Sequence, residues 1–197
     1  MSVVRAGVLT AVSRVLAQGG QFVVFLIAVR LLTAADFGIF AVVAAWTVIL
    51  SQFSISGWPE YVMQWNGPKD RLRHVLAVCL GIGLLFALVG VLAGMLVPGT
   101  SDTATRLMWA LAFWIPIASM GATYAAILNL QERLVWAAGA SILGEIANIT
   151  VSILALLNGQ GVLALAYGRL AGGLVSMLTG LARVRMMPDP RVSLSVM

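Results

Sequence analysis

The chain has 197 residues, of which 61% are hydrophobic and only 10% are charged, and its formal net charge is +5. A soluble domain carries about 25% charged residues, so this composition excludes a water-soluble globular domain of any size. The single cysteine, Cys79, excludes an intramolecular disulfide and a metal site built from cysteines.

Six apolar stretches follow one another along the chain, each about 20 residues or longer, which is enough for a helix to cross the ~30 Å hydrocarbon core of a bilayer. They cover residues 8–32, 37–56, 75–97, 104–128, 134–157 and 162–181. Lipid tolerates no unsatisfied backbone, and these stretches do not alternate in polarity as barrel strands do. The sequence therefore predicts an all-α, polytopic membrane protein. We expect a six-transmembrane-helix bundle over residues 1–185 and a cytoplasmic linker, cut short, over residues 186–197.

The connections between these stretches are short, so we expect consecutive helices to be antiparallel neighbours. Thr33 and Asp36 have the spacing of a capped helix start. Pro59, in the segment Trp58-Pro59-Glu60, predicts that the second span bends or ends there. Two pairs of glycines at a spacing of four predict close approach of helices. These pairs are Gly90 and Gly94, and Gly168 and Gly172.

Basic residues gather in alternate connections. They are Arg5 before the first span, Lys69, Arg71 and Arg73 after the second, Arg133 after the fourth, and Arg183, Arg185 and Arg191 after the sixth. The positive-inside rule places this side in the cytoplasm, so both termini are expected to be cytoplasmic and the protein to lie in the cytoplasmic (inner) membrane. The positive charge is thus mainly a signal of topology, with attraction to anionic lipid second, and it does not indicate nucleic-acid binding.

Four spans carry a face of polar or small residues at helical spacing. These faces are Thr10, Arg14, Gln18 and Gln21 in the first span, Thr47, Ser51 and Ser54 in the second, Ser141, Glu145, Asn148 and Ser152 in the fifth, and Ala166, Arg169, Gly172, Gly173 and Ser176 in the sixth. The pattern is typical of a bundle that encloses a wet cavity, or of a tightly packed core. Our candidate substrate-binding residues are Arg14, Gln18, Gln21, Ser51, Glu145, Asn148 and Arg169.

The charged members of these faces carry most of the information, because a charge at the bilayer centre costs roughly 2.5 to 3.5 kcal/mol on insertion scales. Glu145 and Arg169 lie on adjacent spans, at Cα heights that differ by only ~5 Å. Either they form a buried structural ion pair, or one of them is a cavity charge that contacts substrate. Arg14 either snorkels to the headgroups or offers a cation to an anionic ligand. Gln18 and Gln21 continue its face deeper into the membrane, which favours the second interpretation.

The sequence contains no metal constellation, nucleophile elbow, phosphate loop or paired-carboxylate motif. It therefore predicts no enzymatic activity, no cofactor and no metal ion. The lone histidine, His74, follows Arg73 in a basic connection and has the setting of a solvated loop residue.

Residues 30–41, Arg-Leu-Leu-Thr-Ala-Ala-Asp-Phe-Gly-Ile-Phe-Ala, and the run that follows through Trp46 to Gly57 resemble the junction between the first two helices of Wzx-type polysaccharide flippases. Residues 161–172 look like the sixth helix of these proteins, and the resemblance covers essentially the whole chain. They belong to the multidrug/oligosaccharidyl-lipid/polysaccharide exporter superfamily. The resemblance implies two six-helix lobes around a central, often cationic cavity, of which this chain is the N-terminal one.

The resemblance also implies a function: flipping of undecaprenyl-pyrophosphate-linked oligosaccharide from the cytoplasmic to the outer leaflet, for surface polysaccharide or lipopolysaccharide synthesis. The expected partners are the lipid-linked oligosaccharide, membrane lipids, a second six-helix lobe and polysaccharide synthesis proteins, with no nucleic acid. Two alternatives stay open. One is a drug or cation antiporter of the same superfamily, with Glu145 as its proton or cation site. The other is a non-transporting membrane scaffold for polysaccharide synthases.

Overall fold

The computed structural model describes residues 3–68, 71–96 and 102–188, with side chains in the first helix described at residue 15 and from residue 18 onward. In these residues the chain forms seven helices and no strand. They are α1 (Val3–Leu31), α2 (Ala34–Ile55), α3 (Trp58–Met63), α4 (Leu72–Leu96), α5 (Asp102–Leu130), α6 (Leu134–Leu157) and α7 (Leu163–Val184). The predicted all-α fold class is confirmed, and each long helix occupies one of the six predicted apolar stretches.

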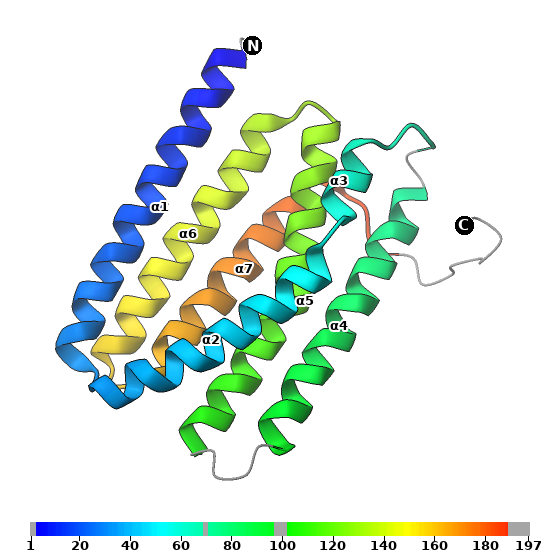
Figure 1. Ribbon diagram of the computed structural model, residues 1–197. Coiled ribbons are helices and arrows are strands. Elements are labelled where there is room, and N and C mark those ends of the chain that lie inside the picture. The colour runs from blue at the N-terminus through cyan, green and yellow to red at the C-terminus, as the bar shows by residue number, and fades with distance from the viewer. Residues whose placement is uncertain (1–2, 69–70, 97–101, 189–197) are drawn as a thin grey trace.

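Five stretches of the described chain are long and apolar enough to cross a membrane: α2 together with α3, and each of α4 to α7. In α1 the described apolar segment is Gln18–Leu31. The long helices run up and down, so that their connections alternate between two ends of the bundle (Figure 1). One end, here called the basic end, carries Arg71, Arg73, Arg133 and Arg183, and the turn at residues 158–161 lies at the other. The protein is therefore a polytopic membrane protein.

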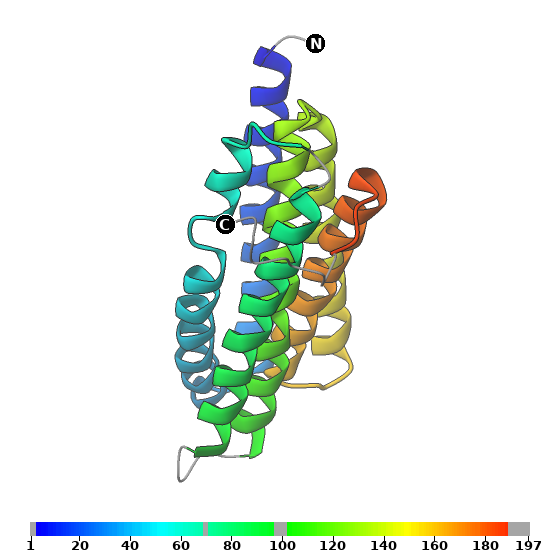
Figure 2. The ribbon, with the colours of Figure 1, turned by 90° about the vertical axis from the view of Figure 1, so that its right-hand side faces the viewer.

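Helix α5 is the centre of the bundle. It packs against α4, α7, α2 and α3, while α6 packs against α7 and α1 packs against α6. Figure 2 shows α2 as an outer layer on one side of α4 and α5, with α7 on the other side. Glycines set the closest approaches: a Cβ on Gly83 of α4 would lie 2.8 Å from the Cα atom of Pro116 in α5. A Cβ on Gly172 of α7 would lie 2.7 Å from the carbonyl oxygen of Gly144 in α6, which confirms the predicted close packing.

The expectation that consecutive helices are neighbours is wrong for α1 and α2. Their junction does contain the predicted capping box, in which Asp36 Oδ2 accepts from the Thr33 amide at 3.0 Å and Thr33 Oγ1 accepts from the Asp36 amide at 3.2 Å. Beside it the rings of Phe25 and Phe37 meet edge to face, 5.9 Å between centroids. From there the helices diverge toward the basic end, because α1 follows α6 while α2 leans across α5 and α4 (Figure 1).

The polar face of α2 explains this divergence. Thr47, Ser51 and Ser54 are only 4%, 2% and 0% exposed, and they belong to the face that packs on α5 and α4. The Thr47 hydroxyl donates to the Val43 carbonyl at 2.8 Å, and the Ser51 hydroxyl donates to the Val48 carbonyl at 2.8 Å. Small side chains whose hydroxyls bond their own helix let two helices approach closely in lipid. This face is therefore a packing surface.

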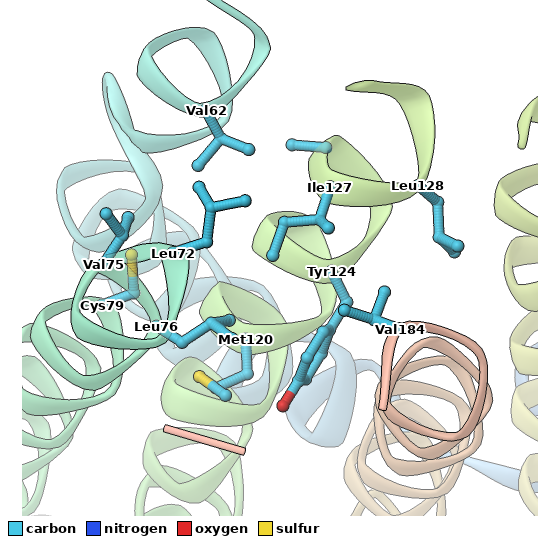
Figure 3. Packing of buried hydrophobic residues seen from close by; sticks show 11 residues of the cluster. Val62, Leu72, Val75, Leu76, Cys79, Met120, Tyr124, Ile127, Leu128 and Val184 are labelled. Carbon is cyan, nitrogen blue, oxygen red and sulfur yellow. The ribbon is translucent and has the colours of Figure 1, made fainter. Parts of the chain in front are cut away.

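The break after α2 also falls where the sequence predicts it. Helix α2 ends at Ile55, Gly57 adopts a left-handed conformation with φ of 84°, and Pro59 stands in the first turn of α3. A positive φ costs glycine nothing, whereas other residues rarely adopt it. The short helix α3 then turns Val62 into a buried cluster with residues of α4, α5 and α7. Figure 3 shows Val62, Leu72 and Ile127 pointing toward one another at the basic end.

Polar contacts fasten the end of α7 to its neighbours at the same end. The hydroxyl of Tyr124 in α5 donates to the carbonyl of Met186 at 3.1 Å. Arg133 Nη1 donates to the carbonyl of Arg183 at 3.2 Å, and the Arg183 guanidinium lies 3.3 Å from the ring centroid of Trp136. The chain that leaves α7 is thus held by both α5 and the start of α6.

Candidate functional site

A groove of about 270 Å³ lies between the diverging helices α1 and α2, and α6 and α7 form its floor. Its residues are Gln21, Val24, Phe25 and Ala28 from α1, Phe37, Phe40 and Ala41 from α2, Asn148 and Ser152 from α6, and Leu165 and Arg169 from α7. The walls are apolar, and most of the polar groups come from the floor. Two of the helices that line this groove, α1 and α2, separate toward the basic end, so the groove is a direct result of the fold.

Among the described residues, Arg169 is the one cation that lines the groove. Its guanidinium carbon lies 5.5 Å from the ring centroid of Phe40 in α2 and 5.8 Å from that of Trp114 in α5. Aromatic faces attract a guanidinium without neutralising it or accepting its N–H hydrogens in the plane. Within the described part of the chain no atom accepts a hydrogen bond from this guanidinium. The N–H donors of Arg169 therefore have no acceptor among the described residues, and its close neighbours are the two aromatic rings.

The predicted polar face of the fifth span forms a chain of hydrogen bonds along α6. Ser152 Oγ donates to Asn148 Oδ1 at 3.5 Å, and Asn148 Nδ2 donates to Glu145 Oε1 at 3.4 Å. Gln21 Nε2 of α1 donates to the same carboxylate oxygen at 3.2 Å, which joins the faces predicted for the first and fifth spans. The two contacts within α6 are at the long end of hydrogen-bond geometry, so the link between α1 and α6 is the better bond.

Glu145 and Arg169 come to the same region of the bundle without forming an ion pair. No nitrogen of Arg169 lies within 4.0 Å of a carboxylate oxygen of Glu145. The structure thus brings together the two charges that the sequence placed at similar depth, and it engages them differently: Glu145 with the amides of Gln21 and Asn148, and Arg169 with two aromatic rings.

A glycine places Arg169 beside the polar face of α6. A Cβ on Gly168 would meet the Ser152 hydroxyl, and it would lie 2.7 Å from the Asn148 carbonyl oxygen. Without a side chain at Gly168, the α7 backbone rests directly on α6. Arg169 then projects at the level of Asn148 and Ser152, and all three line the groove.

The other predicted site residues lie apart from this arrangement. Gln18 is exposed on α1 and is not among the residues lining the groove. Ser51 is buried in the packing face of α2, so it lies between helices. The backbone of Arg14 belongs to α1, but its side chain lies outside the described residues, and its proposed role stays a prediction.

Sequence reasoning missed the aromatic residues that hold Arg169. Phe40 lies in the quoted junction segment and Trp114 in the fourth span, and no spacing rule connects either of them with a residue of the sixth span.

The described ranges contain no group of three or more His, Cys, Asp or Glu that could hold a metal ion. In the described part of the chain the groove thus offers one cation, neutral hydrogen-bonding groups and apolar walls, a combination that suits an amphiphile with an anionic head.

Comparison with known proteins gives one finding. No curated protein and no solved structure matches the chain. The model of a family described as "Polysaccharide biosynthesis protein" matches residues 27–197, which include the end of α1 and the whole of α2 to α7. This match agrees with the resemblance to Wzx-type flippases noted in the sequence. The chain therefore belongs to the polysaccharide biosynthesis protein family.

Proposed function

We propose that this chain is a lobe of a flippase that moves undecaprenyl-pyrophosphate-linked oligosaccharide across the cytoplasmic membrane for surface polysaccharide synthesis. The observation that carries the proposal is the unpaired Arg169 guanidinium at the floor of a groove with apolar walls. A flippase needs no bond to be made or broken, only a path that accepts both a charged head and an apolar tail.

The chemistry of such a lipid matches the two parts of the groove. A pyrophosphate offers several anionic oxygens, and arginine binds such groups with a planar fork of donors. An isoprenoid chain is apolar throughout, and Val24 and Phe25 of α1 and Phe37 of α2 supply apolar surface for it. The diverging walls allow the tail to remain among membrane lipids while the head rests on the floor.

The direction of the groove supports loading from the cytoplasmic side. The helices meet at the Phe25–Phe37 contact and separate toward the basic end. The positive-inside rule assigns the basic end to the cytoplasm. In this arrangement the lobe receives its substrate from the inner leaflet, and a second six-helix lobe facing α1 and α2 would complete the cavity.

A second candidate function is a cation- or proton-coupled antiporter of the same superfamily. The observation that favours it is the carboxylate of Glu145, which accepts hydrogen bonds from both α1 and α6 inside the membrane. Protonation of a carboxylate that links two helices changes the strength of the link, which is how an ion gradient can drive a conformational change. This candidate predicts transport that stops when the pH gradient is collapsed.

The test uses cells whose own flippase gene is deleted, complemented with the complete two-lobe transporter that contains this chain, and measures surface polysaccharide together with the pool of lipid-linked oligosaccharide. Arg169→Gln should abolish surface polysaccharide and make the lipid-linked pool accumulate at normal expression. The matched control is Arg106→Gln, which removes an exposed arginine of α5 outside the groove. Normal surface polysaccharide with Arg169→Gln would contradict the proposal, and loss that depends only on Glu145 and the pH gradient would favour the antiporter.

A further inference from the structure

A second pocket, here called the α2–α3 pocket, lies where α2 breaks. Its volume is about 560 Å³, and its residues are Val48, Ile49, Gln52, Phe53, Ile55, Ser56, Gly57 and Glu60. The left-handed Gly57 turns the chain between the two helices, which leaves Gln52 on one side of the bend and Glu60 on the other. The pocket is therefore built by the break, and neither the groove nor the packing face of α2 contains its polar residues.

The polar groups of this pocket have no partners within the described chain. Gln52, Ser56 and Glu60 are all exposed, and the side chain of each lacks a hydrogen-bond partner there. Gln52 nevertheless lies inside the apolar segment Ala34–Met63. Lipid would leave its amide unsatisfied, so this part of α2 contacts water or a polar ligand.

The pocket and the groove share a face of α2. Ala41 lines the groove and Val48 and Gln52 line the pocket, at intervals of seven and four residues that keep them on the same side of a helix. At ~1.5 Å per residue, Ala41 and Gln52 are about 17 Å apart along α2. One elongated molecule can therefore contact both, with its two ends in different surroundings.

Those surroundings differ in charge. Arg169 makes the groove attractive to an anion, whereas Glu60 makes the α2–α3 pocket repel one. None of the described residues that line this pocket is a cation. A carboxylate, an amide and a hydroxyl together both accept and donate hydrogen bonds, which is what a dense array of sugar hydroxyls requires. The ring of Phe53 adds an apolar surface, stacked on Phe86 at 6.4 Å between centroids, against which the C–H face of a sugar can lie.

We propose that the α2–α3 pocket is a subsite for the glycan of the lipid-linked substrate, selective for a neutral, hydroxyl-rich saccharide. The inference rests on the proposed function, because it assigns the pyrophosphate to Arg169 and the saccharide to Gln52, Ser56 and Glu60. The two pockets divide recognition between them: the groove binds what all such lipids share, and the α2–α3 pocket contacts the part that differs from one polysaccharide to another.

The experiment compares one lipid with and without its glycan. The purified two-lobe transporter that contains this chain is placed in nanodiscs. It is offered either the lipid extract of the source cells or polyprenyl pyrophosphate that carries no glycan. Mass spectrometry of the retained lipids gives the preference for the glycosylated form. We expect Gln52→Leu to lower that preference about tenfold, as loss of a good hydrogen bond does. Glu60→Gln should lower it severalfold, because it replaces a charge-assisted acceptor by a neutral one. Neither variant should change retention of the bare pyrophosphate lipid.

Two variants serve as matched controls, and both should retain the wild-type preference. Gln64→Leu removes an exposed glutamine just after α3, and Glu132→Gln removes an exposed acid at the same end of the bundle. Ser56→Ala is a milder third variant of the pocket. A wild-type preference that survives all three pocket variants, or equal loss of both lipids, would overturn the subsite. Failure of the wild-type protein to retain either lipid would instead overturn the proposed function.

Discussion

The side-chain amide of Gln21 in α1 donates a hydrogen bond to the carboxylate of Glu145 in α6 at 3.2 Å, across the interface by which α1 packs on the bundle. Glycine at position 20 lies against the Ile149 side chain in the same interface. This bond therefore joins the floor of the groove to one of its walls. Because α1 packs chiefly on α6, the position of that wall depends on this interface more than on any contact with α2.

The first prediction concerns this bond. Gln21→Leu and Glu145→Leu should each destabilise the protein, and the double variant should lose less than the sum, because either single change removes the same bond. Interhelical hydrogen bonds in membranes are worth ~0.6 kcal/mol on average, and we expect a coupling energy of about that size or above. A double-mutant cycle on unfolding in detergent measures it. A coupling energy of zero would mean that the two side chains do not interact in the folded protein.

The second prediction separates the charge of Arg169 from its shape. Arg169→Lys restores the positive charge without the planar fork and stacks less well on Phe40. Surface polysaccharide in the complementation assay should therefore recover only in part relative to Arg169→Gln. Phe40→Leu should lower transport less than Arg169→Lys, because it removes one of two aromatic neighbours and leaves the guanidinium. Full activity of Arg169→Lys would show that a point charge is sufficient.

The third prediction concerns the contact between α6 and α7. Gly168→Ala should sharply lower folded yield, because its Cβ would meet the Ser152 hydroxyl and the backbone of Asn148. Gly121→Ala in α5 is the control, since no atom lies within 4 Å of the added Cβ. Alanine favours helix over glycine by roughly 0.5–1 kcal/mol, so the control should fold as well as wild type or better. Size-exclusion chromatography of both variants in detergent gives the comparison.

The fourth prediction tests the orientation. Cysteine replaces Glu132 at the basic end or Gln160 at the other end, both of which are exposed, while the native Cys79 is buried. With an impermeant thiol reagent, Gln160→Cys should label in intact cells, and Glu132→Cys only after the cells are opened. The reverse pattern would place the basic end outside and the mouth of the groove with it.

The helices and most of the site follow from the sequence because hydropathy fixes helix positions and helical periodicity fixes which residues share a face. Glu145, Asn148 and Ser152 do form one polar line, and Gln21 and Arg169 do lie beside it. Periodicity does not predict whether a polar helix face contacts another helix or lines a cavity. The faces of α2 and α6 have the same pattern of polar residues at helical spacing in the sequence. Ser51 nevertheless packs against neighbouring helices, whereas Asn148 lines the groove.

The divergence of α1 and α2 could not be predicted from the sequence for a similar reason. A short connection limits only how far apart two helix ends lie, and the angle between the helices depends on which other helices each one fits. Likewise, the setting of Arg169 depends on Phe40 and Trp114, which reach it from two other helices. Contacts between residues distant in the chain have no local signal, so the aromatic surroundings could be seen only in the fold.

The glycine contacts have a mechanical consequence. At three glycines an added Cβ would collide with a neighbouring helix: Gly83 with Pro116, Gly168 with Asn148, and Gly180 with Tyr124. At Gly180 the added Cβ would lie 2.7 Å from the tyrosine Cβ. Helices packed this closely resist sliding past one another, so we expect α4 to α7 to move together. At Gly20, by contrast, α1 meets only the end of a flexible isoleucine side chain. A transport cycle that opens the groove to one side of the membrane and then to the other would therefore move α1 relative to α4–α7.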